Sequence, residues 1–315
     1  MFSGFFITLL MGKTNFYLGL DSGGTNCRIS ACNENLEVIS TVIYPSVHFS
    51  EAGAIDFARH LSENLKLFME QFGLDLSDCK GMCAGVAGAR TASNKNDIKV
   101  NLSQLLGYDN IVVESDTAIA FEDAHGEDDG LILICGTGSA LFGRVDGKLV
   151  RLGGWGKLLG DDGSSYFLSL NFLKQLVKYF DRYDERAEIE ILLDKRFQIN
   201  RENIIERIYH QKFDIASLSP FIVEQADKGD ALCILVTENE VENILELFQS
   251  FIEKHNIKRN FSVAFTGSLI ENDNYFSKTL RDLIRLNFGK EIFIKENLIN
   301  PVNGALKTAI KYFKK

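Results

Sequence analysis

Two short loops, each broken by glycine and each placed after an apolar run, constrain this chain more than any other feature. The loop Asp21–Asn26 follows the run Phe16–Leu20 and leads into a second run, Cys27–Cys32. The loop Cys135–Ser139 follows the run Leu131–Ile134 and also leads into an apolar run. Short apolar runs bounded by glycine predict buried β-strands. The sequence therefore predicts the same strand–turn–strand arrangement twice.

Each loop has the composition of a phosphate-binding turn. Glycine lacks a Cβ atom, so consecutive backbone N–H groups can point at one anion, and a neighbouring hydroxyl adds another donor. Taken alone, either loop is more simply a tight hairpin turn, because short glycine motifs also occur by chance. The presence of both loops in matching positions favours phosphate binding.

The rest of the hydrophobic pattern alternates between helices and strands. Apolar residues at helical spacing mark Ala52–Phe72, and the runs Gly81–Val86 and Ile111–Val113 predict further buried strands. In the second half, a mostly helical region over Ser164–His255 precedes a strand at Phe261–Phe265. We therefore expect an α/β fold of two duplicated domains that face a common cleft, for which 315 residues are sufficient.

The overall composition narrows the range of partners. A net charge of −9 disfavours nucleic acid, which is bound through clustered Lys and Arg side chains. Six cysteines, without a second Cys or His pair that would complete a zinc site, indicate reduced, buried thiols in a cytoplasmic protein. The apolar residues 1–11 are too short to span a bilayer and are interpreted as a dispensable extension, so no membrane partner is expected.

Asp116 is the first candidate for chemistry. It lies just beyond the strand Ile111–Val113 and at the start of a helix predicted over Thr117–Ala124. Ligands of open α/β sheets bind outside the carboxyl ends of the strands, and a carboxylate there can accept a proton from a substrate hydroxyl. The position fits a helix N-cap equally well, but the nearby phosphate-type loops favour a catalytic role.

The segment Gly153–Ser164 is the densest cluster of unusual residues in the chain. It contains the only tryptophan, Trp155, and the adjacent carboxylates Asp161 and Asp162 among several glycines. Glycine N–H groups donate at close range, Trp155 offers a flat apolar wall, and carboxylates bind vicinal hydroxyls, so the segment predicts a sugar pocket. The alternative is a glycine-rich loop in which an Asp caps the next helix, but capping alone does not need Gly-Gly-Trp-Gly.

Three weaker signals lie outside these motifs or at their edge. Thr266-Gly267-Ser268 follows a predicted strand, where the glycine would let an adenine ring lie against the backbone, although a plain strand–helix turn fits equally well. His48 is interpreted as a structural residue that could instead line the mouth of the pocket. Lys157 is interpreted as a solvated charge.

The order and spacing of these motifs, together with Pro301–Ala305 in the last predicted helix, resemble the N-acetylglucosamine kinase family. This family belongs to the sugar kinase/actin/heat-shock ATPase superfamily and shares the benzoyl-CoA-reductase-type ATPase domain. Cys83–Ala89 is similar to the bacterial branch that phosphorylates both N-acetylglucosamine and N-acetylmuramic acid. The resemblance covers the chain from Asn15 to its end.

The resemblance implies two actin-like (ribonuclease H-like) domains with mixed sheets flanked by helices and an ATP cleft between them. The first domain is expected at residues 15–118, with the C-terminal helix 300–315 packed back on it. The second is expected at residues 119–299, with a helical insertion. A homodimer is left open.

The implied reaction transfers a phosphoryl group from ATP, with Mg²⁺, to the 6-hydroxyl of an N-acetylated amino sugar. Asp116 would act as the base on that hydroxyl, and Asp21 would hold Mg²⁺, mainly through water. The residues implied to bind ATP are Gly23, Gly24, Thr25, Asn26, Gly136, Thr137, Gly138, Gly267 and Ser268. The residues implied to contact the sugar are His48, Ala87, Gly88, Asp116, Thr137, Gly154, Trp155, Gly156 and Asp161.

Two departures from the family bear on the choice of sugar. Its animal members have Ser at the position of Ala87 and Asn near the position of His48. One rival interpretation is the ATPase that activates 2-hydroxyacyl-CoA dehydratases, which binds an iron–sulfur cluster through cysteines, for which Cys79 and Cys83 are candidates. Another is a sugar sensor without catalysis. The apolar setting of the cysteines disfavours the first rival, and Asp116 with the two glycine loops disfavours the second.

Overall fold

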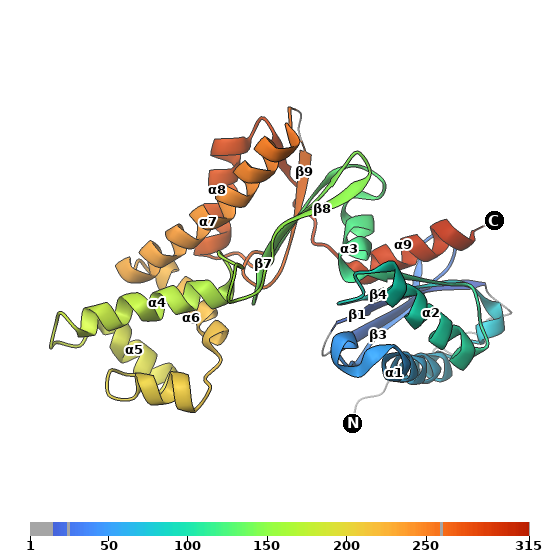
Figure 1. Cartoon of the computed structure of the whole chain (residues 1–315), viewed down its shortest axis with the longest axis horizontal. Helices are drawn as coiled ribbons and strands as arrows, with labels where there is room; N and C mark the ends of the chain where they lie inside the picture. Colours follow the sequence, from blue (N-terminus) through green and yellow to red (C-terminus); the bar gives the residue numbers. More distant parts are fainter. Residues whose placement is uncertain (1–14, 24–25, 259–260, 315) are drawn as a thin grey trace, which may run out of the picture. The chain divides into compact units, whose positions relative to one another are not determined.

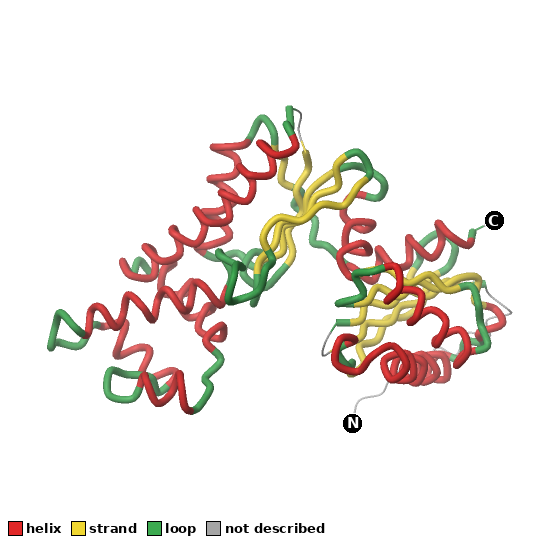
Figure 2. The backbone as a smooth tube through the Cα atoms, in the orientation of Figure 1, coloured by secondary structure: helices red, strands yellow, loops and turns green. Residues whose placement is uncertain are grey.

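The computed structural model describes residues 15–23, 26–258 and 261–314. They form two compact units: the first unit runs to Glu127 and resumes at Ile299, and the second unit extends from Asp128 to Leu298 (Figure 1). Each unit contains one five-stranded mixed sheet with helices packed on it (Figure 2). The predicted α/β fold with two mixed sheets is therefore confirmed. No helix among the described residues is long and apolar enough to cross a membrane.

The sheet of the first unit is built around one buried central strand. Its strands are β1 (Phe16–Ser22), β2 (Asn26–Cys32), β3 (Val38–Pro45), β4 (Cys79–Val86) and β5 (Ile111–Ser115). Their order is β3-β2-β1-β4-β5. β1 pairs antiparallel with β2 and parallel with β4, and β3 and β5 extend these pairings outward. β1 and β2 are therefore consecutive antiparallel strands, and β1 is the central strand of the sheet.

Helices cover both faces of this sheet, because successive β1 side chains point to opposite sides. Phe16, Leu18 and Leu20 pack in one core together with apolar residues of α1 (Phe49–Phe72) and α2 (Ala92–Leu106). Tyr17 packs in a second core with residues of α3 (Asp116–His125) and α9 (Pro301–Phe313). Between β3 and β4 the chain also forms the short helical turn η1 (Leu76–Asp78).

The C-terminal helix α9 approaches its neighbours in the first unit very closely, as Figure 1 shows for α3 and α9. A Cβ atom on Gly304 would lie 1.7 Å from the carbonyl oxygen of Ile119 in α3, and one on Gly19 would lie 2.8 Å from the backbone of α9. The Asp123 carboxylate accepts hydrogen bonds from the Asn300 N–H and from the Lys307 ammonium, both at 2.8 Å. α9 therefore holds α3, and with it Asp116, against the sheet.

The second unit repeats the topology of the first. Its strands are β6 (Gly130–Cys135), β7 (Ser139–Val145), β8 (Lys148–Gly153), β9 (Phe261–Thr266) and β10 (Ile292–Ile294), in the order β10-β9-β6-β7-β8. β6 in the centre pairs antiparallel with β7 and parallel with β9, and the outer pairings follow the same rule as in the first unit. The strand–turn–strand repeat predicted from the sequence is therefore a repeat of the whole sheet.

The connection from β8 to β9 holds the region predicted to be mostly helical, which the structure divides into several pieces. These are α4 (Ser165–Phe180), α5 (Glu188–Phe197), η2 (Glu206–His210), η3 (Ile215–Leu218), α6 (Ser219–Asp227) and α7 (Ala231–His255), with α8 (Tyr275–Phe288) between β9 and β10. The buried Glu190 carboxylate of α5 is paired with Arg186 and Arg201. Burial opposes ionisation of Glu190, but hydrogen bonds and charge from Arg201, followed by the charge of Arg186, hold its pKa below the usual range.

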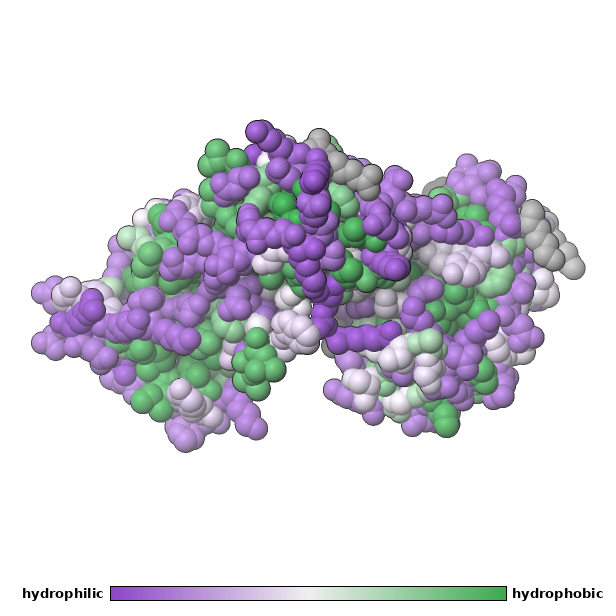
Figure 3. All heavy atoms as spheres, turned by 45° about the horizontal axis from the view of Figure 1, so that its top comes forward, coloured by the Kyte–Doolittle hydropathy of each residue, from purple (hydrophilic) through white to green (hydrophobic). Residues whose placement is uncertain are grey.

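The boundary between the units differs from the one expected at residue 118. α3 continues to His125 and packs on α9, so the first unit extends to Glu127. All six cysteines are buried free thiols, as predicted. Charged and polar side chains cover much of the face seen in Figure 3, with apolar side chains scattered between them.

Candidate active site

In the first unit, the predicted site residues meet where β1, β4 and β5 end. Asp21, near the end of β1, lies opposite Arg28 of β2 and Gly85 of β4. Burial raises the pKa of the Asp21 carboxyl to about 6; the charge of Arg28 opposes this rise, and the charge of Asp116 adds to it. The Asp21 and Asp116 carboxylates therefore lie close enough for their charges to repel each other. A cation bound beside Asp21 would be stabilised.

Asp116 is exposed at the first turn of α3 and is not the N-cap. Ser115 is the N-cap, because its side chain accepts a hydrogen bond from the Ala118 N–H at 3.1 Å. One carboxylate oxygen of Asp116 accepts from the Thr117 N–H at 2.8 Å, and the other oxygen has no partner among the described residues. The capping interpretation of Asp116 is therefore replaced by that of a carboxylate oriented by its own helix and open to a ligand.

His48, Ala87 and Gly88 also gather at this edge. The Ala87 N–H donates to the Ser22 carbonyl at 3.0 Å, which fixes the chain after β4 beside the end of β1. Gly88 adopts a left-handed φ of 88°, and a Cβ atom there would lie 3.7 Å from Cε1 of His48. His48 caps α1, since Nδ1 accepts from the Ser50 N–H at 3.3 Å. His48 therefore has a structural role as the N-cap of α1. Its Nε2 makes no hydrogen bond among the described residues and could donate one to a ligand.

In the second unit, the glycine loop between β6 and β7 is a tight turn. The Gly136 N–H donates to the Gly138 carbonyl at 2.9 Å, and the Gly136 carbonyl accepts from Ser165 at the start of α4. Thr137 is exposed at the tip of the turn. A Cβ atom on Gly138 would lie 2.7 Å from Oδ2 of Asp161, so glycine lets the Asp161 carboxylate reach the loop.

The turn after β9 lies against the same loop. Gly267 has a φ of 114°, and a Cβ atom there would lie 2.4 Å from the Cys135 carbonyl oxygen. The Leu269 N–H donates to that carbonyl at 3.2 Å, and the Gly136 Cβ position is 3.6 Å from the Ser268 nitrogen. The loops predicted for the ATP phosphates and for adenosine are therefore neighbours within the second unit.

The segment from Gly153 to Ser164 folds around the Asp161 carboxylate. Asp161 itself has a left-handed φ of 68°, and its Oδ1 accepts from the Gly156 N–H at 2.9 Å. Gly154 also has a positive φ, and a Cβ atom there would lie 2.9 Å from the Cβ of Ala140. Ser164, and neither Asp161 nor Asp162, caps α4 by accepting from the Phe167 N–H. The alternative that an Asp is present only to cap this helix is therefore wrong.

A buried carboxylate that the sequence analysis did not single out supports this segment. Glu240 of α7 accepts from the Gly163 N–H at 2.7 Å and from the side-chain amides of Asn171 and Asn243. On the other side, the Ser139 hydroxyl donates to the Asp162 carbonyl at 2.6 Å. The available signal was an acidic residue on the apolar face of a long amphipathic helix, since such a residue must find donors inside the protein.

Trp155 is 66% exposed, so its ring is available to a ligand. The guanidinium carbon of Arg151 lies 4.6 Å from the centroid of the ring, a cation–π contact on one of its sides. Leu158 and Leu159 in the same segment are also exposed. Exposed apolar side chains beside a glycine-rich backbone favour contact with a sugar ring.

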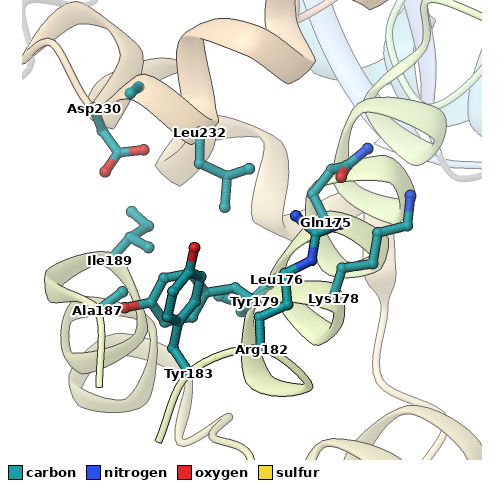
Figure 4. A pocket seen from close by; sticks show the side chains of 11 residues that line it. Gln175, Leu176, Lys178, Tyr179, Arg182, Tyr183, Ala187, Ile189, Asp230 and Leu232 are labelled. Atoms are coloured by element: carbon teal, nitrogen blue, oxygen red, sulfur yellow. The ribbon is translucent and has the colours of Figure 1, made fainter. Parts of the chain in front are cut away.

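Two cavities of the second unit adjoin this segment. One, of about 270 Å³, is lined by Trp155, Asp161 and residues of β7 and α7. The other, of about 680 Å³, is lined by Thr137, Gly138 and Asp161 together with residues near η2 and η3. A further cavity between α4, α5 and α7 contains none of the predicted site residues, and its Asp230 caps α7 (Figure 4).

The structure thus brings the predicted residues together in two groups, one in each unit. Asp21, His48, Ala87, Gly88 and Asp116 form the first group. The second group consists of Gly136, Thr137, Gly138, Gly154, Trp155, Gly156, Asp161, Gly267 and Ser268. Gly23 and Asn26 flank the first hairpin loop and are joined by a hydrogen bond from the Gly23 N–H to the Asn26 carbonyl at 2.9 Å. Gly24 and Thr25, predicted to bind ATP, lie outside the described residues.

The donor set of the first unit fits Mg²⁺. This ion is held in proteins through one or two carboxylates, retains several waters and is completed by substrate phosphates. Asp21 supplies such a carboxylate, since burial raises its pKa and the charge of Arg28 offsets that rise only in part. No group of three or more His, Cys, Asp or Glu side chains that could hold a metal ion occurs among the described residues.

Comparison with known proteins identifies the family. The model of the BadF/BadG/BcrA/BcrD ATPase family matches residues 18–309, which includes both sheets except the first two residues of β1 and includes every predicted site residue. This chain belongs to that family. Membership in the BadF/BadG/BcrA/BcrD ATPase family agrees with the nucleotide-binding fold to which the paired glycine loops pointed, and it supports the use of ATP.

Individual relatives match most of the chain. A Clostridium acetobutylicum protein named N-acetylmuramic acid/N-acetylglucosamine kinase is 28% identical over 87% of this chain and 92% of its own length. A Dictyostelium discoideum N-acetyl-D-glucosamine kinase is 27% identical over 86% and 91%. A Porphyromonas gingivalis structure, provisionally named an N-acetylglucosamine kinase, has a TM-score of 0.70 at 20% identity over 95% and 98% and supports the fold.

Proposed function

We propose that this protein transfers the γ-phosphoryl group of ATP to the 6-hydroxyl of N-acetylglucosamine, N-acetylmuramic acid or both. The observation that carries the proposal is the Asp116 carboxylate, which is oriented by α3, exposed, and relieved of capping by Ser115. The relatives named as kinases of these sugars match 87% and 86% of the chain, and that similarity supports the choice of an amino sugar.

We assign a separate role to each of the two groups of residues. The hairpin loops around Gly23 and Gly136 bind the ATP phosphates, and Gly267-Ser268 lies against adenosine. Asp161, held by the Gly156 N–H, binds sugar hydroxyls, and the ring of Trp155 packs against the sugar. His48, Ala87 and Gly88 contact the sugar from the first unit. This division is supported by the hydrogen bonds that fix each loop.

In the proposed mechanism, Asp116 accepts the proton of the 6-hydroxyl as that oxygen bonds to the γ-phosphorus, and the bond from this phosphorus to the β,γ-bridging oxygen breaks to release ADP. Asp21 would hold Mg²⁺, mainly through water, and the bound ion would supply positive charge to neutralise the phosphates. Burial, with a smaller contribution from the charge of Asp116, raises the pKa of Asp21, so a cation bound beside Asp21 would be stabilised. Phosphoryl transfer depends chiefly on positioning and charge stabilisation, so the proposed mechanism needs an oriented base and a bound cation and no covalent intermediate.

The activator of 2-hydroxyacyl-CoA dehydratases is less consistent with the cysteines of this chain. Cys83 is fully buried, and Cys79 is buried with its thiol directed to the Gly81 carbonyl at 3.5 Å. Burial also raises the pKa of the Cys79 thiol to about 11. A cluster shared between two subunits needs accessible thiolates, so these two positions are poor ligands for it.

The test is an ADP-release assay with the purified protein, ATP and Mg²⁺. We expect N-acetylglucosamine or N-acetylmuramic acid to stimulate ADP release far more than glucose or glucosamine does. Mass spectrometry of the product should show a phosphate on the 6-hydroxyl. If none of the four sugars stimulates ADP release, the proposed kinase activity is wrong.

A further inference from the structure

The larger of the two cavities beside the sugar segment has an unusual lining. Thr137, Gly138 and Asp161, which we assign to the ATP and the sugar, lie on its wall together with two lysines, Lys157 and Lys212. With a volume of about 680 Å³ it offers more room than the neighbouring cavity beside Trp155, of about 270 Å³. The cavity can therefore hold a substituent in addition to a sugar ring.

The two lysines have no carboxylate partner among the described residues, although Asp161 and Asp214 line the same cavity. The ammonium of Lys157 lies 5.7 Å from the centroid of the Tyr166 ring. Lys212 adopts a left-handed φ of 50°, a conformation in which glycine or asparagine would be favoured on backbone grounds. Two unpaired cations in one cavity indicate an anionic ligand.

The cavity also has an apolar part, which comes from η2, η3 and the residues between them. Ile208, Phe213 and Ile215 provide most of it, and Phe213 also packs edge-on against Phe197. A phosphate group would use the two ammonium groups but would gain nothing from these side chains. A ligand that carries a carboxylate beside a methyl group would use both parts of the lining.

We propose that this cavity is a subsite for the lactyl group on the 3-oxygen of N-acetylmuramic acid. Lys157 and Lys212 bind the lactyl carboxylate, and the apolar side chains of Phe213 and Ile215 contact its methyl group. This inference rests on the proposed function and makes it more specific, because N-acetylglucosamine lacks the lactyl group. Lys157, interpreted from the sequence as a solvated charge, thereby becomes a residue that determines specificity.

The test compares both sugars in single variants Lys157→Met and Lys212→Met of the full chain. Loss of a charge-assisted hydrogen bond should lower kcat/KM for N-acetylmuramic acid by about tenfold or more. Values for N-acetylglucosamine and the KM for ATP should change by less than about threefold. Lys178→Met is the matched control, because Lys178 lines the separate cavity of Figure 4 and should leave both sugars unaffected.

Three other results of these measurements would contradict the proposal of a lactyl subsite. A rise in the KM for ATP with both sugars would assign the lysines to phosphate, and an equal loss with both sugars would assign them to general support of the loop. Wild-type protein that phosphorylates N-acetylglucosamine and does not bind N-acetylmuramic acid would refute the subsite and leave the kinase activity intact. Binding of each sugar, followed through Trp155 fluorescence, tests the subsite without turnover. A protein that binds N-acetylmuramic acid through the two lysines but releases no ADP would contradict the proposed activity and not the subsite.

Discussion

The two units have the same sheet and differ in the segment that leads from its third strand to the next helix. In the first unit the chain passes from β3 to α1 through Ser46–His48. In the second unit the matching passage from β8 to α4 is the long segment Gly154–Ser164, with Trp155 and Asp161. Since strand order and direction are shared, the sheet alone does not distinguish the units. Their difference in chemistry comes from the loops at one sheet edge.

Each sheet has its own set of loops after its strands, and the loops of the two units supply different kinds of groups. The first unit provides side-chain carboxylates, Asp21 and Asp116, whose charges interact. The second unit provides the Asp161 carboxylate and the exposed Thr137 hydroxyl on a frame of glycine turns, whose N–H groups at Gly136, Gly156 and Gly163 are bonded within the unit. A carboxylate beside a reacting hydroxyl can accept its proton, whereas a fixed carboxylate and hydroxyl can bind the other hydroxyls of a sugar. The comparison therefore predicts that the first unit determines the rate and the second unit determines binding.

The largest expected effect is that of Asp116→Asn. Loss of a general base should lower kcat by about a hundredfold or more, while the KM for the sugar changes little. Asp161→Asn in the second unit should instead raise the KM for the sugar more than it lowers kcat. Steady-state kinetics of the two variants check the division, and circular dichroism checks that both are folded. Near-normal turnover of Asp116→Asn would contradict the assignment of the base.

A smaller effect is expected for Gly163→Ala, which disturbs the contact between the segment Gly153–Ser164 and Glu240 of α7. A Cβ atom at Gly163 would lie 2.4 Å from the Ile244 side chain, and its φ of 81° is strained for alanine. Overpacking and strain together should lower the free energy of unfolding by about 2–3 kcal/mol. The KM for the sugar should rise, because the new Cβ atom would displace the backbone at Gly163 and weaken the hydrogen bond from its N–H to Glu240.

Gly229→Ala is the matched control for that variant. Gly229 has a φ of 92°, but a Cβ atom there meets nothing within 4 Å. It should lose only the strain contribution, about 1–2 kcal/mol, and keep the sugar KM. Chemical denaturation of both variants measures the difference. Equal destabilisation with an unchanged KM in both would show that close packing at Gly163 does not hold the sugar segment.

Much of the fold could be predicted because its signals are local. Buried runs such as Leu131–Ile134 and the glycine turns after them mark strands and hairpins wherever they occur. The extent of α3 was less accessible, because it depends on packing against α9, which is distant in sequence. For the same reason the first unit continues to Glu127 instead of ending at residue 118.

The site could be predicted where one residue type carries the chemistry, and not where contacts decide. Asp116 and Asp161 were identified from their positions beside strands and glycines. Glu240 was not, because its role depends on donors from three separate segments. Lys212 is likewise distant in sequence from Lys157, and only the folded chain places both in one cavity.

The effect furthest from the sugar segment concerns the first unit and its C-terminal helix, through Gly304→Ala. Alanine should stabilise the helix by about 0.5–1 kcal/mol, but its Cβ atom would lie 1.7 Å from the Ile119 carbonyl oxygen, and overpacking against backbone should cost about 3 kcal/mol or more. The net result should be a loss of about 2 kcal/mol or more.

Hydrogen exchange measured by mass spectrometry locates that loss. Amides of α3, α9, β1 and β4 should exchange faster in Gly304→Ala, whereas those of α4–α8 should not change, because α9 packs in the first unit. Asn303→Ala is the control, since it also raises helix propensity without contacting α3 through a new Cβ atom. If Gly304→Ala is as stable as this control, α9 does not fix α3. The position of Asp116 would then depend on β5 and Ser115, and the first unit would not need α9 to place its catalytic carboxylate.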